Sequence, residues 1–187
     1  MKRFLMTLVV AAVFMSTSAQ AASGQLYFSG SAGVSISEDM DFPGISISFS
    51  PGWNVTGAVG YDFGQFRAEG EVAYRTADID EVNGVSFPAD ADLSTLSFMA
   101  NGYYDHEMGN SPLTPYVGVG LGIADTDLNL AGTSVGDETN LAYQFMLGLG
   151  YEVAPNVVLT GGYRYFGIVD TEAPNSHEFN LGARFMF

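Results

Sequence analysis

The sequence predicts an all-β fold, specifically a transmembrane antiparallel up-and-down β-barrel of eight strands. Three observations lead to this prediction. After residue 22, apolar and polar residues alternate with a period of two, and no helical i, i+3, i+4, i+7 pattern is sustained. Most alternating stretches reach the roughly 9–11 residues that a tilted membrane strand needs. The connections between them are short and long in turn, as in barrels that cross membranes.

The first 21 residues have the features of a secretory signal peptide. Two basic residues precede an apolar core at 4–15, and Ala19 and Ala21 supply the small residues of a cleavage site. This core is too short to span a bilayer as a helix, which takes about 20 residues. We therefore expect a cleaved signal peptide at 1–21 and a barrel domain at 22–187.

The first three stretches of the barrel domain define its two faces. In the stretch 25–36 the even positions are apolar or small, whereas the odd positions are mostly Ser, Gln or Tyr. The stretch 53–63 ends at Gly64-Gln65, and glycine at the first central position suits a type II′ hairpin turn. In the stretch 66–77 the even positions are mostly apolar, and the odd positions carry the charged residues Arg67, Glu69, Glu71 and Arg75.

Five further stretches alternate in the same way, at 92–105, 113–124, 139–152, 157–169 and 177–187. The second and third of these place glycines on the polar face. In the fourth, Arg164 lies on the face away from its neighbours Tyr163 and Tyr165. The last stretch sets Glu178 and Arg184 against an apolar row made of Phe179, Leu181, Ala183, Phe185 and Phe187.

The connections alternate between short turns and longer polar segments. Short turns follow every second stretch, at 64–65, 109–112 and 154–156. The longer segments carry most of the acidic residues and lie at about 37–52, 78–91, 125–138 and 170–176. In transmembrane barrels the short turns face the periplasm and the long loops face outward. We therefore expect four acidic external loops, with both termini of the barrel on the periplasmic side.

The polar faces should point into the barrel. They carry all four arginines of residues 22–187, a region with no lysine, whereas faces toward water are rich in lysine and mixed charge. An eight-stranded barrel is only just wide enough for its side chains to fill it, so charges inside need partners. We predict a lumen charge network that plugs the barrel, made of Arg75 and the pairs Asp62 with Arg67, Glu71 with Arg164, and Glu69 with Arg184.

Two further features of the faces lead to expectations. The glycines on the polar faces are expected to make room for long side chains from the opposite wall, although they could instead line a thin water path. On the apolar faces, aromatic residues such as Phe66 and Tyr104 lie near one end of the strands, and Tyr74 and Phe179 lie near the other. Such residues would form two girdles at the membrane interfaces.

The apolar row at the end of the chain resembles the C-terminal assembly signal of bacterial outer-membrane barrels. The segments TPYVGVGLGIA (114–124) and NVVLTGGYRYFG (156–167) resemble strands five and seven of the opacity/OmpA-like outer-membrane β-barrel family, a porin-like group. The resemblance implies the outer membrane of a Gram-negative bacterium, with lipid and lipopolysaccharide as surroundings and recognition by the barrel-assembly machinery. Members of this family are envelope-stabilising proteins, surface antigens, adhesins or small pores.

Few residues suit other chemistry. A net charge of −15 disfavours nucleic acid as a partner. His106 falls in a turn, where a solvated residue is expected. Ser176-His177-Glu178 invites comparison with lipid-modifying barrel enzymes, but adjacent residues on a regular strand point to opposite faces, so Ser176 and Glu178 are expected to project away from His177. We expect no catalytic residue, no cofactor and no defined metal site.

The sequence thus favours a non-enzymatic outer-membrane barrel that presents acidic loops, for envelope integrity or for surface interaction and adhesion. The principal alternative is a small diffusion pore through the lumen. A lipid-modifying enzyme would require a role for His177. A secreted soluble barrel for a lipophilic ligand conflicts with the lysine-free polar faces and with the terminal Phe187.

Overall fold

The structure is a computed structural model, and it describes residues 24–38, 40–42, 45–82, 85–86, 91–109, 111–130, 133–169 and 174–187. The regular secondary structure of these ranges is β-sheet. They contain no helix with the length and apolarity that a membrane span requires. The expected signal peptide, with its cleavage residues Ala19 and Ala21, lies outside the described residues.

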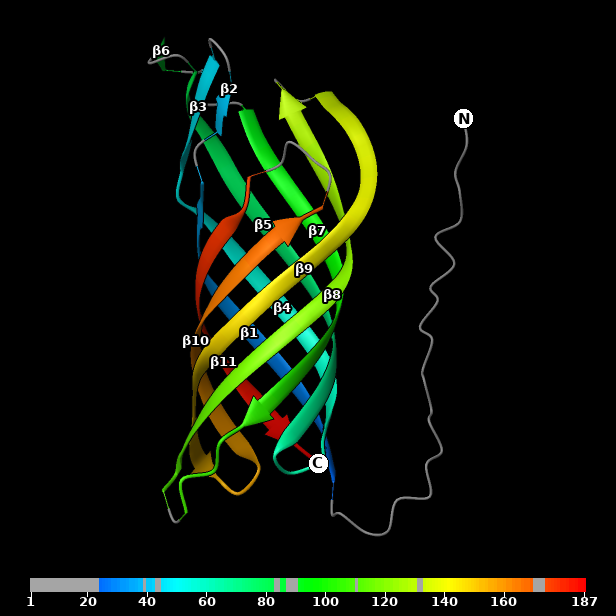
Figure 1. Cartoon of the computed structure of the whole chain (residues 1–187), viewed down its shortest axis with the longest axis vertical. Coiled ribbons are helices and arrows are strands. Elements are labelled where there is room, and N and C mark those ends of the chain that lie inside the picture. The colour runs from blue at the N-terminus through cyan, green and yellow to red at the C-terminus, as the bar shows by residue number, and fades with distance from the viewer. Residues whose placement is uncertain are drawn as a thin grey trace.

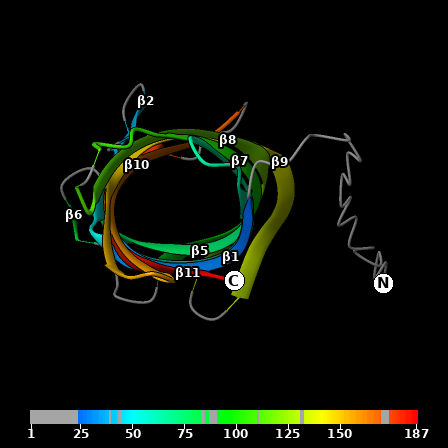
Figure 2. The same cartoon turned by 90° about the horizontal axis from the view of Figure 1, so that it is seen from below.

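Eight strands of the described chain form a closed antiparallel barrel, which confirms the predicted fold. Figure 1 shows the cylinder from the side, and Figure 2 shows the closed ring from below. Each strand pairs with the next in the chain, and the last pairs with the first, with Tyr27 opposite Met186 and Ser37 opposite Ser176. The barrel strands are β1 (Gln25–Ser37), β4 (Gly52–Asp62), β5 (Phe66–Val82), β7 (Ala91–Asp105), β8 (Leu113–Leu130), β9 (Thr133–Ala154), β10 (Val157–Ile168) and β11 (Ser176–Met186).

Three of the segments predicted as loops contain β-structure, so that prediction was wrong in part. β8 and β9 remain paired as far as Leu130 opposite Thr133, and β5 continues to Val82. The short strands β2 (Met40–Phe42), β3 (Ile45–Ser50) and β6 (Val85–Ser86) add to this upper end (Figure 1). Polar composition marked the end of the apolar outer face, not the end of pairing, because backbone N–H and C=O groups form a ladder whatever the side chains are.

Tight connections and the C-terminus lie together at the lower end of the barrel in Figure 1. The Phe63 N–H donates to the Phe66 carbonyl at 2.8 Å, and Gly64 between them has a φ of +96°, as the turn chemistry predicted. The Phe187 N–H donates to the Leu26 carbonyl at 2.9 Å. The last residue is therefore part of the barrel rim.

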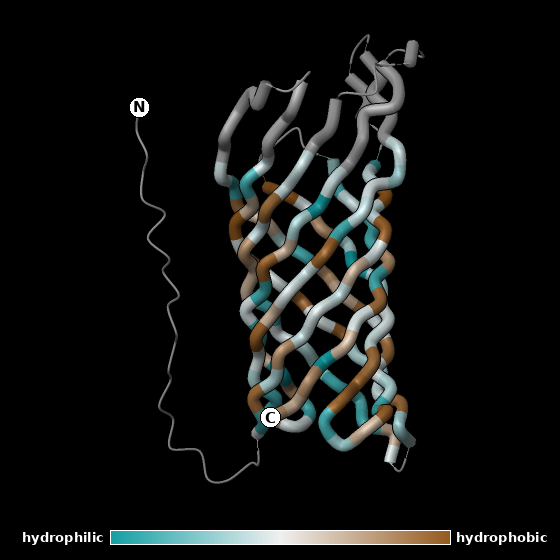
Figure 3. Tube along the Cα trace, turned by 180° about the vertical axis from the view of Figure 1, so that it is seen from behind, coloured by the Kyte–Doolittle hydropathy of each residue, from teal (hydrophilic) through white to brown (hydrophobic). Residues whose placement is uncertain are grey.

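The barrel is apolar outside and polar inside, as the alternation predicted. Leu181 on the outer face of β11 and Phe187 directly after that strand are 77% and 75% exposed, whereas Glu178 on the inner face of β11 is 0% exposed. Figure 3 shows hydrophobic and hydrophilic residues alternating along the strands. A one-residue slip in register would move the arginines to the outer face, at a cost of about 2–4 kcal/mol each near the middle of a bilayer. The register is therefore strongly fixed.

Aromatic pairs occupy both ends of the outer face, in agreement with the expected girdles. At the lower end the ring centroids of Phe66 and Tyr104 are 5.4 Å apart. At the upper end those of Trp53 and Tyr74 are 5.6 Å apart. Trp53 was not among the residues expected there.

The inward glycines do make room for large side chains, but these come from neighbouring strands and not from the opposite wall. A Cβ atom on Gly148 of β9 would lie 2.5 Å from the ring of Tyr116 on β8. One on Gly118 of β8 would lie 2.5 Å from the ring of Tyr103 on β7. Tilted strands let an inward aromatic ring lean over the adjacent strand, so a glycine beside it is required.

Candidate functional site in the barrel lumen

The buried charged residues of the described chain form a balanced set inside the barrel. They are four arginines and four carboxylates, each no more than 9% exposed: Arg67, Arg75, Arg164, Arg184, Glu69, Glu71, Asp105 and Glu178. Removing a charge from water costs several kcal/mol unless a partner compensates it. Equal numbers of the two signs therefore allow the buried charges to compensate one another inside the lumen.

The upper part of the set is centred on two carboxylates. Glu71 accepts two hydrogen bonds from Arg164, with Nη1 to Oε1 at 3.0 Å and Nη2 to Oε2 at 2.7 Å, which is the predicted pair. Glu178 accepts from Arg75 at 2.5 Å and lies 3.7 Å from Arg164. The Arg75 guanidinium also donates to Ser97 at 2.6 Å. Glu178 was assigned to the right face but not to the network, although its register position directly opposite Arg164 was a usable signal.

The lower part differs from the predicted pairing of Asp62 with Arg67. Those two residues are opposite in register, but Arg67 donates to Asp105, with Nε to Oδ2 at 2.7 Å and Nη2 to Oδ1 at 3.0 Å. Asp62 lies at the rim and accepts from the Gly64 N–H at 2.8 Å. Asp105 is buried whereas Asp62 is only partly so, and the buried carboxylate has the greater need of a cation.

The predicted pairing of Glu69 with Arg184 was also wrong. Glu69 accepts from four neutral donors, namely Tyr27 at 2.9 Å, Tyr103 at 3.0 Å, Asn101 at 3.2 Å and Ser29 at 3.3 Å. These donors satisfy both carboxylate oxygens, and Arg184 instead lies 3.6 Å from Asp105. Sequence reasoning missed the tyrosines and Asn101. Their only signal in the sequence was that each occupies an inward-facing position of its strand.

Amide side chains join the two parts into one network. Gln144 donates to Glu71 at 3.2 Å and to the Asn101 Oδ1 atom at 2.7 Å, and Asn101 donates to Glu69. Tyr27 donates to Glu69 and accepts from Arg67 at 3.2 Å. An unbroken series of polar contacts therefore runs from Arg75 in the upper lumen to Asp105 in the lower lumen.

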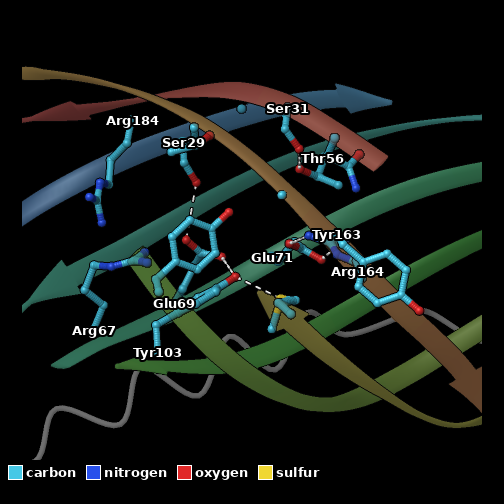
Figure 4. Close-up of a pocket in the computed structure, with 16 residues that line it drawn as sticks. Ser29, Ser31, Thr56, Arg67, Glu69, Glu71, Tyr103, Tyr163, Arg164 and Arg184 are labelled. Atoms are coloured by element: carbon cyan, nitrogen blue, oxygen red, sulfur yellow. Dashed lines mark hydrogen bonds and ion pairs between the residues drawn. The ribbon is translucent and has the colours of Figure 1, made fainter. Parts of the chain in front are cut away.

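A small cavity of about 80 Å³ lies beside this network. Figure 4 shows its lining, with Glu69 between Ser29 and Tyr103, and with Glu71 next to Arg164. Buried polar atoms that make no hydrogen bond within the described protein also border it, among them Nε and Nη1 of Arg184 and Oδ1 of Asn180. The volume suffices for several water molecules, which could satisfy these atoms.

The histidines lie outside the network. Ser176 and Glu178 are buried in the lumen while His177 is on the outer face, so the three form no relay, as predicted. His177 instead contacts the Tyr163 hydroxyl through Nδ1 at 2.7 Å and Glu38 through Nε2 at 3.1 Å. His106 is exposed in a turn, as expected.

The residues of the expected assembly signal line the outer face of β11. Phe179, Leu181 and Phe185 are exposed along the strand, Ala183 is half-buried, and Phe187 closes the rim. Their role in assembly stays a prediction. The side chains of most acidic residues in the predicted loops lie outside the described residues.

Known proteins are similar to this chain in sequence. Residues 6–187 match the family model described as outer membrane protein beta-barrel domain. Major surface antigen 4 of Anaplasma marginale is 29% identical over 82% of this chain and 69% of that protein. Outer membrane protein PagN of Salmonella typhimurium is 24% identical over 95% of this chain and 88% of that protein.

Solved structures agree with the family match. Neisserial surface protein A superposes with a TM-score of 0.68 at 24% identity, over 87% of this chain and 97% of that one. The N-terminal β-barrel domain of Pseudomonas aeruginosa OprF superposes with a TM-score of 0.51 at 16% identity, over 88% and 99%. The chain belongs to the outer membrane protein β-barrel family and is an integral protein of the Gram-negative outer membrane.

Proposed function

We propose that this protein is a non-enzymatic outer-membrane barrel with a closed lumen, which displays acidic loops for envelope integrity or surface interaction. The observation that carries the proposal is the neutral, continuous polar network between Arg75 and Asp105. Its members contact one another, so a passing ion would have to break buried pairs. Removing one partner of such a pair typically costs about 3–5 kcal/mol.

The distribution of charge supports a role for the outer surface. The four arginines of residues 22–187 are all buried in the lumen, and the region has no lysine. Apart from the histidines, the charged side chains available outside are therefore acidic. Such a surface suits cations or basic partners and repels anionic molecules. One relative is named as a surface antigen, which is consistent with this role.

Biogenesis and surroundings follow from the same barrel. Lipid and lipopolysaccharide would contact the apolar outer wall. The barrel-assembly machinery would recognise the outward row that ends at Phe187. The absence of a relay at Ser176-His177-Glu178 favours a non-enzymatic role over lipid modification, and deleting the gene should leave the lipid profile unchanged.

Conductance tests the closed lumen. The full chain is expressed, purified from outer membranes, checked by the heat-dependent gel shift of a closed barrel, and reconstituted in a planar bilayer. We expect no discrete openings from the unaltered protein. A Glu71→Ala/Arg164→Ala variant, which removes a pair from the network, should conduct.

A small diffusion pore is the second candidate function, and the polar cavity beside Arg184 favours it. Steady discrete openings from the unaltered, verifiably closed barrel would establish the pore and refute the plug. In that case the Glu71→Ala/Arg164→Ala variant should show larger conductance steps than the unaltered protein.

A further inference from the structure

A polar cluster interrupts the apolar outer wall at the upper ends of β1 and β11, where it also includes one residue of β10. The upper ends of these strands can be followed in Figure 1. It consists of Glu38, Tyr163, Asn175 and His177, and we call it the rim cluster. His177 is opposite Ile36 on one side and Tyr165 on the other. The next outward residue on β11 is Phe179, which is exposed and begins the apolar wall. The rim cluster thus lies where the hydrocarbon region gives way to headgroups.

Side chains and backbone hold the rim cluster in one arrangement. The His177 ring is fixed between the Tyr163 hydroxyl at 2.7 Å and the Glu38 carboxylate at 3.1 Å. Asn175 donates from Nδ2 to the second oxygen of Glu38 at 3.1 Å, and its carbonyl accepts from the Glu38 N–H at 2.9 Å. The cluster is therefore preorganised before any ligand arrives, which lowers the entropic cost of binding.

Hydrogen-bonding capacity is left over and accessible. The side chains of His177 and Glu38 are 37% and 45% exposed. An ionised carboxylate offers about four lone-pair sites, and the rim cluster uses one contact on each Glu38 oxygen. Asn175 keeps one amide hydrogen free of these contacts. The cluster can therefore accept hydrogen bonds from a ligand's hydroxyl groups and can donate one in return.

Aromatic rings flank these polar groups. The Tyr165 ring meets the His177 ring edge-on at 5.3 Å, and the Tyr163 ring lies 5.5 Å from the Phe179 ring. Amphipathic aromatic residues are suited to the membrane interface. Their rings also offer flat apolar surface to the C–H groups of a sugar. Hydroxyl recognition beside aromatic rings is the chemistry of carbohydrate binding.

Apart from the histidines, the outer surface offers no basic side chain for direct recognition of phosphate. Such recognition uses Arg or Lys, and residues 24–187 contain only the four arginines buried in the lumen. A neutral polyhydroxylated headgroup fits the acceptor-rich rim cluster better than an anionic one does. We propose that the rim cluster binds a sugar of an outer-leaflet glycolipid, whose acyl chains lie along Phe179 and Leu181 below it.

The inference rests on the outer-membrane location and not on whether the lumen conducts. It is tested with the full-length protein in detergent, titrated with lipopolysaccharide and, separately, with lipopolysaccharide from which the phosphates have been removed. Glu38→Ala should weaken binding of both probes by about tenfold, the loss expected for about 1.4 kcal/mol. Tyr163→Phe, which keeps the ring and removes the hydroxyl contact, should weaken it less.

Tyr74→Phe is the matched control, because Tyr74 lies on the outer face of β5, opposite β10 in the ring of eight. It should bind both probes like the unaltered protein, and all variants must show the heat-dependent gel shift of a closed barrel. The assignment would be overturned if Glu38→Ala and Tyr163→Phe both bound the probes as tightly as the unaltered protein. It would also be overturned if Tyr74→Phe weakened binding as much as Glu38→Ala does. So would loss of binding on dephosphorylation or equal displacement by phosphatidylglycerol, which would indicate phosphate recognition or unselective lipid contact.

Discussion

Replacing Glu71 by Gln should destabilise the barrel strongly, because it leaves buried positive charge without its partner. Glu71 accepts both hydrogen bonds of a bidentate contact from Arg164, whose next carboxylate, Glu178, is 3.7 Å away and already accepts from Arg75. Gln keeps the size of the side chain but loses the charge. Breaking a buried ion pair in this way costs about 3–5 kcal/mol.

The assay is reversible urea unfolding in lipid vesicles, followed by the gel shift and by tryptophan fluorescence. Trp53, the single tryptophan, lies on the outer face of β4 and reports insertion. Asp62→Asn is the matched control, since Asp62 lies at the rim and its loss should cost at most about 1 kcal/mol.

A double variant separates the contribution of the ion pair to stability from that of side-chain packing. In Glu71→Gln/Arg164→Met both charges are removed, and replacing a whole buried pair by neutral groups is often close to neutral for stability. We therefore expect the double variant to be more stable than Glu71→Gln alone, with a coupling energy within the range of about 0.5–3 kcal/mol for residues in contact. If the free energy of unfolding of Glu71→Gln is within about 1 kcal/mol of that of the unaltered protein, the ion pair does not stabilise the barrel and the reasoning fails.

Three further substitutions test other parts of the barrel in the same unfolding assay. Tyr103→Phe removes one donor from Glu69 and should cost about 1.5–3 kcal/mol, as for hydrogen bonds to charged groups; no loss would mean that water replaces the hydroxyl. Gly148→Ala places a Cβ atom against Tyr116 and should cost about 1–3 kcal/mol, unless the ring can move aside freely. Leu181→Arg puts a charge on the lipid face and should cost about 2–4 kcal/mol near the bilayer midplane; a neutral effect would place Leu181 near an interface.

The strands and their faces could be predicted because both depend on a period of two. The alternation of apolar and polar residues alone placed four arginines inside the barrel, and the structure agrees: Arg67, Arg75, Arg164 and Arg184. The ring of eight also placed β5 opposite β10, which was enough to pair Glu71 with Arg164.

The alternation of inward and outward positions could not determine which carboxylate each remaining arginine contacts. An arginine side chain is long enough to reach several positions on the inner wall, so the choice depends on which carboxylates are most deeply buried and which already have donors. Asp105 therefore contacts Arg67, whereas Asp62 stays at the rim. Glu69 is satisfied by hydroxyl and amide groups, which carry no charge pattern that a sequence reading could follow.

The use of arginine in place of lysine inside the barrel suits the demands of a narrow lumen. A guanidinium is planar, donates to two oxygens at once and stacks on aromatic rings, whereas an ammonium is a compact and strongly hydrated charge. Arg67 uses both properties, since it donates twice to Asp105 and lies 4.2 Å from the centroid of the Tyr103 ring. Arg75 lies 3.8 Å over the Phe166 ring while it donates to Glu178. With arginine confined to the lumen, the polar groups of the outer surface are acidic, hydroxyl, amide and imidazole groups, and recognition there must use them.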